Sequence, residues 1–467
     1  MVYQIPHHLS YCLYYLKNPM NKITYNYHND SKDIFSFIKD YEWAVYLCSN
    51  HKTFKNQRYD IITCSPVQKI YSYINKTIVE SNDNKLEYHD DPIDILAKIM
   101  KDYDSDILDL PFTGGAIGYM SYDLGNTYEG INIKNTDLDM PLMAFGIYDW
   151  AIIVDHLDKE INLVYKQENK LISTIKELFE NKNFKRYEPN SYSIDSNCIS
   201  NLTYNEYEKK FNKIQSYIKN GDCYQINFSQ RFSLNYSGDT WDIYNKISPT
   251  YSAPYSAYIK MPFIDLMSFS PERFLSYDNE IVETKPIKGT RPVSQDKEIN
   301  NKALEELASS YKEKAENLMI VDLLRNDLGK NCEFGSVKVT KLFDIETFAN
   351  VHHLVSTVQG KILYTSDIFK LIKGCFPGGS ITGAPKIRAM QIINELEPDN
   401  RGIYCGSIGY ISSNGNTDLN IAIRTVAATN DKLFFWGGGG IVYDSEVESE
   451  YKETFDKIKP LLKIFEN

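Results

Sequence analysis

Short runs rich in β-branched and aromatic residues follow one another through this chain without the regular strand–helix alternation of a doubly wound fold. Such runs, bounded by Gly, Pro, Asn and Asp, are typical of β-strands. Helical periodicity marks the segments 171–179, 204–220, 296–324 and 445–462. The predicted strands lie at 43–48, 151–154, 224–234, 256–260, 265–270, 336–342, 353–362, 401–411, 418–428 and 432–442. Strands that follow strands predict an α+β fold with largely antiparallel sheets.

A polar stretch at 181–201 divides the chain into two regions. Its weak hydrophobic periodicity favours a linker. We therefore predict an N-terminal region at 1–180 and a C-terminal region at 202–467. The C-terminal region begins with a predicted helix that Thr203 would cap, with Glu206 three residues later as in a capping box.

Composition excludes several kinds of partner and location. The 467 residues, 42% of them hydrophobic, are enough for a large core. The formal net charge is -11 and Lys and Arg are not clustered, so we expect no nucleic-acid partner. No apolar run approaches the roughly 18–20 residues of a membrane span, and residues 1–8 lack the pattern of a signal peptide. Eight widely spaced cysteines indicate reduced thiols, so a cytoplasmic protein is expected.

Lys288 lies in the run KPIKGT, between Pro286 and Gly289. The two flanking residues predict a tight turn. If the site is partly buried, desolvation lowers the pKa of the lysine and frees its amine for nucleophilic attack. A solvated loop lysine is the alternative, and Lys288 alone does not decide between them.

Two predicted helices each carry a pair of glutamates with helical spacing, Glu313 with Glu316 and Glu450 with Glu453. Residues three apart share one helix face, so the four carboxylates can converge on one hard cation such as Mg²⁺. On this hypothesis Glu316 and Glu453 bind the ion directly, and Glu313 and Glu450 hold metal-bound waters. Lys457 follows one turn after Glu453. The alternative is two solvated helix faces.

Three further features suggest a carboxylate site. The four glycines at 437–440 would expose backbone N–H groups to a ligand, although a flexible loop is the alternative. Arg424 interrupts an apolar strand pattern, and an inward-facing guanidinium there needs an anion. Ser380 and Thr382 lie where a helix is predicted to begin, so they would cap it or contact substrate.

Several long motifs carry a resemblance to a known family. They are PIKGT at 286–290, ENLMIVDLLRNDL at 316–328, HLVS at 353–356, FPGGSITGAPKIRAM at 376–390 and EYKET at 450–454. They resemble the chorismate-utilising enzymes, and among them the aminodeoxychorismate synthase component I family. The resemblance covers nearly all of the C-terminal region. It implies two large, mostly antiparallel sheets packed as a sandwich, with helices outside and an active site in a cleft.

The resemblance also implies roles for individual residues. Gly439, Gly440, Arg424 and Tyr404 would bind one carboxylate of chorismate, and Lys457 would face the other. His353 would assist proton transfer at the leaving hydroxyl, and the four glutamates would hold Mg²⁺. Anthranilate synthases carry a small residue at the position of Lys288 and more often threonine at that of Ser380. Both positions therefore favour amination.

The implied reaction is a Mg²⁺-dependent amination of chorismate at C4, which gives 4-amino-4-deoxychorismate for p-aminobenzoate and folate synthesis. Lys288 would add at C2, and ammonia would enter at C4 as the lysine leaves. The chain has no region left for a glutaminase, so ammonia would come from a separate glutamine amidotransferase subunit in a heterodimer. Anthranilate synthase component I and a noncatalytic chorismate- or amino-acid-binding protein remain the alternatives.

The N-terminal region shows a looser match, to the region that anthranilate synthase component I also carries. Its segments at 43–49 and 58–62 resemble the family's WxxLLxS and RFDI segments. Relatives bind tryptophan there, so Ser49 is the candidate residue of a tryptophan pocket. The LLES sequence of the regulated anthranilate synthases is missing, and feedback control is therefore not predicted.

Overall fold

The computed structural model describes residues 19–28, 30–50, 57–81, 84–105, 107, 109–134, 137–181, 184–189, 192–347, 351–362, 364 and 367–465. The expectation for residues 1–8 and the cysteine at position 12 lie outside these ranges. Within them, all seven cysteines are free thiols. No helix of this part is long and apolar enough to cross a bilayer.

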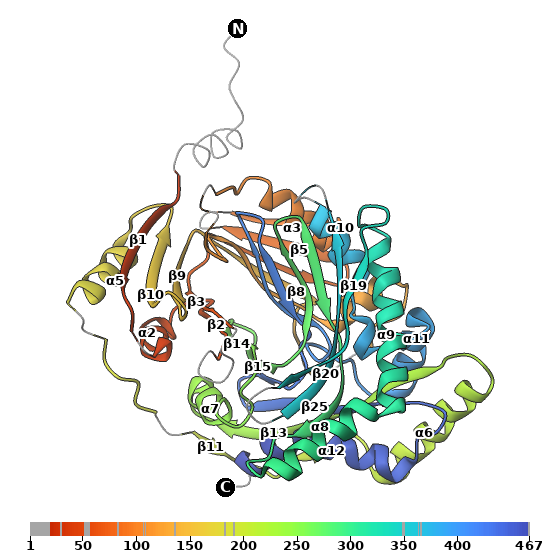
Figure 1. Ribbon diagram of the computed structural model, residues 1–467. Helices are drawn as coiled ribbons and strands as arrows, with labels where there is room; N and C mark the ends of the chain where they lie inside the picture. The colour runs from red at the N-terminus through yellow and green to blue at the C-terminus, as the bar shows by residue number, and fades with distance from the viewer. Residues whose placement is uncertain are drawn as a thin grey trace.

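The described residues form two antiparallel sheets that lie against each other, with helices around them (Figure 1). The first has 13 strands, in the order β1 (Asn21–Asn26), β10 (Glu160–Tyr165), β9 (Trp150–Asp155), β3 (Tyr59–Thr63), β2 (Val45–Cys48), β14 (Tyr255–Lys260), β15 (Asp265–Ser270), β24 (Thr425–Ala428), β25 (Lys432–Ile441), β13 (Gln225–Ser237) and β11 (Ser193–Ile194), with β12 (Ile199–Ser200) and β21 (Gly383–Ala384) also on β13. The predicted α+β sandwich is confirmed.

The second sheet has 12 strands within the same described ranges. Their order is β18 (Ile287–Pro292), β20 (Val351–Lys361), β17 (Ile281–Lys285), β16 (Arg273–Asp278), β23 (Thr417–Asn420), β22 (Ser407–Ser412), β7 (Gly115–Met120), β8 (Met143–Tyr148), β4 (Gln68–Tyr73), β5 (Lys76–Ser81) and β6 (Asn84–Tyr88), with β19 (Lys338–Thr347) on β20. The helices are α2 (Ser31–Ile38), α3 (Pro92–Met100), α4 (Tyr122–Tyr128), α5 (Lys170–Glu180), α6 (Tyr204–Lys219), α7 (Thr240–Ile247), α8 (Lys297–Ser309), α9 (Tyr311–Gly329), α10 (Ile368–Cys375), the 3₁₀ turn η2 (Gly379–Ile381), α11 (Lys386–Leu396) and α12 (Val447–Phe465).

Both sheets contain strands from the N-terminal and the C-terminal regions. In the first sheet Cys48 of β2 is paired with Ser256 of β14. In the second, Gly118 of β7 is paired with Gly409 of β22. The predicted linker itself contributes β11 and β12 to the edge at β13. The regions 1–180 and 202–467 therefore share their sheets.

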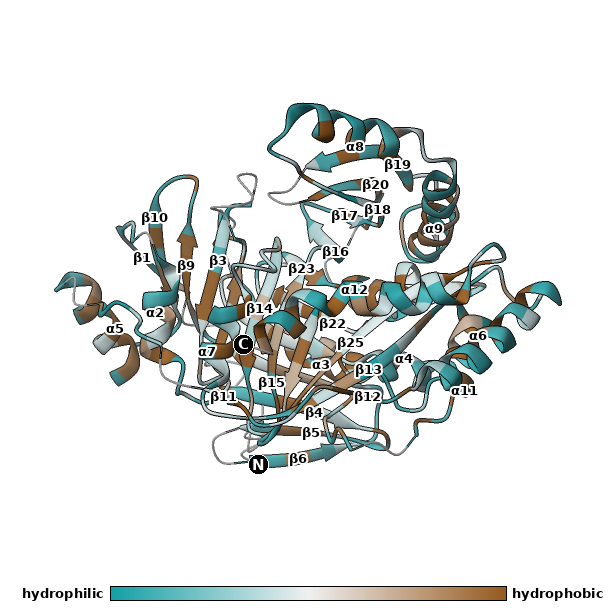
Figure 2. Ribbon diagram, turned by 90° about the horizontal axis from the view of Figure 1, so that it is seen from below, coloured by the Kyte–Doolittle hydropathy of each residue, from teal (hydrophilic) through white to brown (hydrophobic). Residues whose placement is uncertain are grey.

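Neighbouring residues of the strands in the first sheet belong to two different hydrophobic cores. Ile61 of β3 and Ile153 of β9 lie in the core that also contains the second sheet. Their neighbours Ile62 and Ile152 lie in the core under the surrounding helices. Successive side chains of a strand point to opposite faces, so the first sheet is covered on both sides. Figure 2 shows the corresponding hydrophobic colour on β3 and β9 in the interior, and more hydrophilic residues on α6 and α8 outside.

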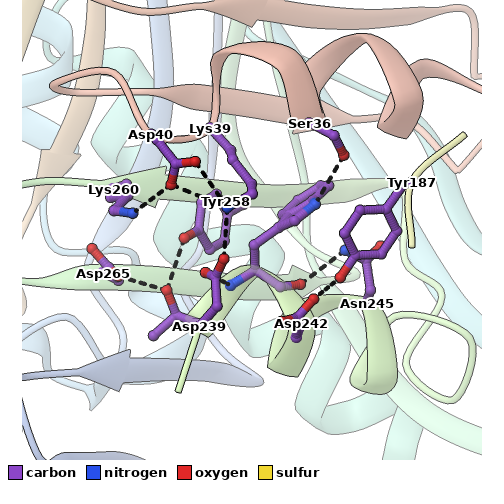
Figure 3. A network of polar contacts seen from close by, with 12 residues as sticks. Ser36, Lys39, Asp40, Tyr187, Asp239, Asp242, Asn245, Tyr258, Lys260 and Asp265 are labelled. Carbon is purple, nitrogen blue, oxygen red and sulfur yellow. Dashed lines mark hydrogen bonds and ion pairs between the residues drawn. The ribbon is translucent and has the colours of Figure 1, made fainter. Parts of the chain in front are cut away.

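A polar network fastens α2 and α7 to the first sheet (Figure 3). Lys39 pairs with Asp40 at 3.0 Å and with Asp239 at 2.7 Å. The Trp241 indole N–H donates to the Ser36 hydroxyl at 3.3 Å. These contacts join α2 to the start of α7, so the network supports the packing of these helices.

The helices predicted at 171–179, 204–220 and 445–462 are confirmed. The helix predicted to begin at Ser380 and Thr382 begins later, at Lys386 of α11, and no side chain caps it. Thr203 and Glu206 form the expected capping box at the start of α6. The single helix predicted at 296–324 is wrong, because α8 ends and α9 begins at Ser310. Ser310 has an extended ψ of 105°, and its hydroxyl accepts a hydrogen bond from the Glu313 amide. Serine competes for backbone groups in this way and favours helix starts over helix interiors.

Two predicted strands are wrong over part of their length. Residues 401–406 form turns before β22 rather than a strand. The strand predicted at 418–428 is interrupted, because β23 belongs to the second sheet and β24 to the first. The chain crosses between the sheets at 421–424, where Arg424 adopts a positive φ of 52°. Arg424 therefore lies between the two sheets.

Candidate functional site

A cavity of about 510 Å³ lies beside β18, β25 and the helices α9 and α12, within the size range of small-molecule sites. Its lining includes most of the predicted site residues, namely Lys288, Glu313, Glu316, His353, Ser380, Tyr404, Arg424, Gly440, Glu450, Glu453 and Lys457. Gly439, Thr382 and Ser49 are not part of the lining. Residues predicted from separate motifs are thus brought together.

Two crossings between the sheets meet at this cavity. The chain passes from β15 to β16 at Pro271 and Glu272, and from β23 to β24 at 421–424. The Ile421 amide donates to the Glu272 carbonyl at 3.0 Å. The Phe269 amide donates to the Arg424 carbonyl at 3.1 Å. Backbone that leaves a ladder frees side chains to point into the space between sheets, and Glu272 and Arg424 both line the cavity.

Lys288 lies in strand β18 rather than in a tight turn, so that prediction is wrong. Gly289 has a positive φ of 73°, and the pairing of β18 with β20 shifts register between Lys288 and Thr290. A β-bulge of this kind redirects a side chain. The Lys288 ammonium donates to the Ser380 carbonyl at 3.4 Å. Burial lowers the pKa of Lys288, and the nearby Glu272 carboxylate opposes the shift.

Glu272 is a site residue that sequence reasoning missed. Its side chain is buried in the cavity wall. Burial raises the pKa of Glu272, with Lys288 acting in the opposite direction. A carboxyl of this kind can hold a proton that a solvated glutamate would lose. One glutamate between two apolar runs has no spacing partner, so the sequence offers no pattern that distinguishes it from a surface residue.

His353 lies on β20 with its ring buried beside β18. Its Nδ1 lies 2.9 Å from the Thr290 hydroxyl. Burial, and then the neighbouring Arg424 guanidinium, lower the pKa of His353 to about 4. The imidazole is therefore neutral near pH 7, where it can orient or accept a proton but carries none to donate as an imidazolium.

The four glutamates line one side of the cavity, from α9 and α12, as their spacing predicted. Burial raises the pKa values of Glu316 and Glu450, and the like charge of Glu453 raises both further. The Glu313 Oε2 and Glu450 Oε2 atoms are buried and have no hydrogen-bond partner among the described residues. Buried carboxylate oxygens that repel one another are the donor set that a hard cation satisfies.

Three other glutamate oxygens have protein partners. Arg291 donates to Glu313 Oε1 at 2.9 Å, and the Ser445 hydroxyl donates to Glu450 Oε1 at 2.6 Å. Lys457 pairs with Glu453 at 2.7 Å. Among the residues that the structure describes, no group of three or more His, Cys, Asp or Glu side chains is placed to hold a metal ion. An ion at this position would take one or two carboxylates directly and complete its coordination with water and substrate.

The glycines at 437–440 are part of strand β25 and pair with β13, so the loop alternative is wrong. They allow α12 to pack closely against the strand. A Cβ on Gly437 would lie 2.1 Å from the Thr454 carbonyl oxygen. A Cβ on Gly439 would lie 3.1 Å from Glu450 Oε2 and 3.3 Å from Glu453 Oε1. Gly439 thus leaves room for the glutamates, and Gly440 lines the cavity.

Arg424 lines the cavity, and no acidic side chain of the described residues forms a salt bridge with it. Its guanidinium carbon lies 5.7 Å from the centre of the Tyr251 ring. Burial lowers the pKa of Arg424. A desolvated cation without a counter-charge is costly, and its positive φ of 52° is strained. The arrangement is suited to an anion supplied from outside the chain.

Four smaller contacts complete the site. Tyr404 is buried and stacks on Trp436, with ring centroids 5.8 Å apart. Lys457 donates to the Gly438 carbonyl at 2.6 Å. Ser380 lies buried in the cavity wall, whereas the Thr382 hydroxyl donates to the Gly379 carbonyl at 3.2 Å. The Thr382 hydroxyl is thus engaged by its own backbone turn.

Ser49 lies at a different cavity, of about 230 Å³, that the N-terminal and C-terminal regions form together. Its backbone N–H and its hydroxyl both donate to Asp60 Oδ1 at 2.8 Å. The Ser49 hydroxyl is therefore held inside a protein network, and its part in a tryptophan pocket stays a prediction.

The cavity combines a lysine of lowered pKa, a carboxyl of raised pKa, an arginine with no acidic partner among the described residues, and four glutamates in its lining. These groups define a site for a small anionic substrate that undergoes nucleophilic and acid–base chemistry. The profile of the chorismate binding enzymes matches residues 47–463. The chain therefore belongs to the chorismate-binding enzyme family.

Similar proteins carry two different activity names. The chain is 42% identical over 439 residues to aminodeoxychorismate synthase component 1 of Escherichia coli, covering 92% of this chain and 95% of that protein. It is 36% identical to anthranilate synthase component 1 of Acetivibrio thermocellus, covering 88% and 87%. The anthranilate synthase component I structure from Streptococcus pneumoniae superposes with a TM-score of 0.77 at 32% identity, covering 87% and 92%. The menaquinone-specific isochorismate synthase of Escherichia coli, at 15% identity and a TM-score of 0.72 over 98% of both chains, shares the fold.

Proposed function

We propose that this chain aminates chorismate at C4, as an aminodeoxychorismate synthase component 1, with Mg²⁺ and with ammonia from a separate glutaminase. The observation that carries the proposal is the Lys288 amine, which points into the cavity at 3.4 Å from the Ser380 carbonyl. Burial lowers its pKa, so a larger fraction is a free amine at a given pH. The relative with 42% identity bears the matching name.

Different residues would bind the two carboxylates of the substrate and the metal ion. Arg424 and Tyr404 would hold one carboxylate of the substrate, and Lys457 would face the other. Glu316 and Glu453 would bind Mg²⁺ directly, with Glu313 and Glu450 holding its waters. When bound, the ion would neutralise a substrate carboxylate and polarise the substrate. The two unpartnered oxygens of Glu313 and Glu450 support this assignment.

The chemical steps conserve the atoms of substrate and enzyme. The free amine of Lys288 forms a C–N bond at C2, both conjugated ring double bonds shift, and the C4–O bond breaks. The leaving hydroxyl takes a proton and departs as water, and Glu272, whose pKa is raised by burial, is placed to donate it. Ammonia then adds at C4, both double bonds shift back, and the Lys288 amine leaves. The new C4 ammonium gives one proton to Glu272, which restores that carboxyl. The neutral His353 would orient the reacting hydroxyl.

The cysteines support an external source of ammonia. A glutaminase of the thiol type needs a cysteine with a lowered pKa. Among the described residues, burial instead raises the pKa values of Cys48, Cys64, Cys223, Cys332 and Cys405 to between about 11 and about 12. These five thiols are thus poorly suited to that role, and in the proposal a partner subunit supplies the reactive cysteine.

The test is product identification. Purified protein, chorismate, Mg²⁺ and ammonium salt at mildly alkaline pH are expected to give aminodeoxychorismate, detected by mass, without release of pyruvate. Glutamine in place of ammonium is expected to give none until a glutaminase subunit is added. Anthranilate with pyruvate would instead establish the anthranilate synthase reaction. Chorismate binding without turnover would establish a binding protein.

The metal assignment has its own test. Glu316→Gln is expected to weaken Mg²⁺ binding at least about 10-fold, because a neutral amide replaces a direct anionic ligand. The measurement is the Mg²⁺ concentration for half-maximal amination, together with Mn²⁺ binding followed by electron paramagnetic resonance.

Glu448→Gln is the matched control. Glu448 is exposed on α12 and does not line the cavity, and it accepts a hydrogen bond from the Tyr204 hydroxyl at 3.4 Å. This variant is expected to bind both ions as the unchanged protein does. Equal metal affinity in the two variants would remove Glu316 from the metal site.

A further inference from the structure

We propose that Arg401 is a positioning residue for substrate binding, because its guanidinium joins three separate segments of the cavity wall. Arg401 lies in the turns between α11 and β22 and is 2% exposed. It does not line the cavity itself. Its effect on the reaction would therefore pass through the residues that it holds.

The hydrogen bonds of Arg401 define these segments. Nη1 donates to the Ile381 carbonyl at 3.0 Å, and Nη2 donates to the Asn227 carbonyl at 2.6 Å. Ile381 and Asn227 both line the cavity, and Ile381 follows Ser380 in η2. The guanidinium also lies 5.6 Å from the centre of the Tyr404 ring. One planar group thus sets η2, β13 and Tyr404 relative to one another.

Glu397 fixes the guanidinium in turn. It accepts Nε at 2.9 Å and Nη2 at 2.7 Å from Arg401. The same carboxylate accepts the backbone N–H and the hydroxyl of Ser229, each at 2.8 Å. The paired charges are buried, where removal of one partner leaves the other uncompensated. The Arg401–Glu397 pair therefore ties the end of α11 to β13.

Residues of the N-terminal region also contact the turns that contain Arg401. The Arg401 guanidinium lies 4.7 Å from the centre of the Tyr122 ring. The Tyr122 amide donates to the Gly402 carbonyl at 2.8 Å, and the Gly402 amide donates to Asp123 Oδ2 at 2.7 Å. Helix α4 of the first region is thus part of the scaffold of a cavity whose lining lies in the second.

Lysine cannot replace this arrangement. Three nitrogens of the Arg401 guanidinium donate in different directions of one plane, whereas a lysine ammonium donates from a single point. Arg401→Lys keeps the charge beside Glu397 but loses contact with at least one of the two carbonyls. The η2 segment and Tyr404 then lose their fixed spacing. We expect the loss to fall on substrate binding.

The experiment rests on the proposed function, but it distinguishes a failure of the role proposed for Arg401 from a failure of that function. For Arg401→Lys the KM for chorismate is expected to rise about 10- to 100-fold, from the loss of one or two charged hydrogen bonds. The kcat is expected to stay within a few-fold, and the KM for ammonium to stay unchanged. Destabilisation alone would lower the active fraction, hence kcat, at constant KM.

A binding measurement gives a second readout that needs no turnover. Trp436 lines the cavity and stacks on Tyr404, so its fluorescence reports on an occupied site. Chorismate titrations in a Lys288→Ala background are expected to show the same rise in Kd when Arg401→Lys is added. If the unchanged protein makes no aminated product, the proposed function fails while this titration still tests the role of Arg401.

Arg231→Lys is the matched control. Arg231 lies on β13, is 8% exposed, and pairs with Asp137 at 2.8 Å and Asp399 at 3.1 Å, away from the cavity lining. Its KM for chorismate is expected to stay unchanged. Equal KM values in both arginine variants, or a fall in kcat alone for Arg401→Lys, would overturn the proposal. If Arg401→Lys does not fold, Glu397→Gln decides by the same two criteria, because it keeps the size of the side chain but loses the acceptor for Arg401 Nε.

Discussion

Replacing Lys288 by alanine is expected to lower the amination of chorismate by roughly 10³-fold or more, the scale on which loss of a nucleophile acts. The variant is expected to keep chorismate binding, because Arg424, Tyr404 and the glutamates are unchanged. The measurement is steady-state formation of aminodeoxychorismate, with intact-mass analysis of protein mixed with chorismate and Mg²⁺ without ammonium. A covalent adduct is expected on the unchanged protein and none on Lys288→Ala.

The pH dependence of the adduct follows from the shifted pKa of Lys288. Burial lowers that pKa, and only the deprotonated amine reacts. Adduct formation should therefore increase with pH and level off below the pH at which an ordinary lysine would. Lys285→Ala is the control, since Lys285 pairs with Glu346 at 2.6 Å and does not line the cavity. Full amination by Lys288→Ala would show that the lysine is not the nucleophile.

Substitution of Arg424 is expected to weaken substrate binding and to increase the stability of the protein. Arg424→Gln removes the cation that faces the substrate carboxylate, and we expect kcat/KM for chorismate to fall about 100-fold or more. The same change removes a desolvated charge that has no acidic partner among the described residues. The free energy of unfolding without substrate should therefore rise by about 0.5–2 kcal/mol. Steady-state kinetics and thermal unfolding of the same preparation measure both effects.

Arg325→Gln provides the comparison. Arg325 is exposed on α9 and pairs with Asp322 at 3.0 Å, so both its kinetics and its stability should change little. An Arg424→Gln protein that loses stability would mean that the guanidinium has an anionic partner in the fold. One that keeps its KM would mean that chorismate does not contact it.

The parts of the site that sequence reasoning found are those with a pattern in the chain. Glu313 and Glu316, and Glu450 and Glu453, share helix faces, and helical spacing alone places each pair together. The motifs of the resemblance then placed Lys288 and Arg424 in the same site. Glu272 has no such pattern, because its position depends on where β15 ends and the chain crosses to the other sheet.

The parts of the fold that sequence reasoning missed are local backbone conformations that tertiary contacts determine. The sequence predicts a turn at Gly289, but its positive φ serves a bulge inside β18. It predicts exposed backbone at the glycines 437–440, but Gly437 and Gly439 make room for α12. The apolar run around Arg424 predicted one continuous strand, because a change of sheet leaves no mark on hydrophobic periodicity. In each case the distant segment that decides the conformation is not visible in the local sequence.

The sharing of both sheets by the two regions has a consequence for synthesis on the ribosome. Gly118 in β7 needs Gly409 in β22 as its partner, and Cys48 in β2 needs Ser256 in β14. The first region therefore emerges with open strand edges and must wait for most of the chain before either sheet is complete. Such non-local pairing is slow, and open edges are prone to aggregate. Nascent chains of this protein should depend on chaperones until translation is nearly finished, and neither region should be a usable module for fusion or exchange.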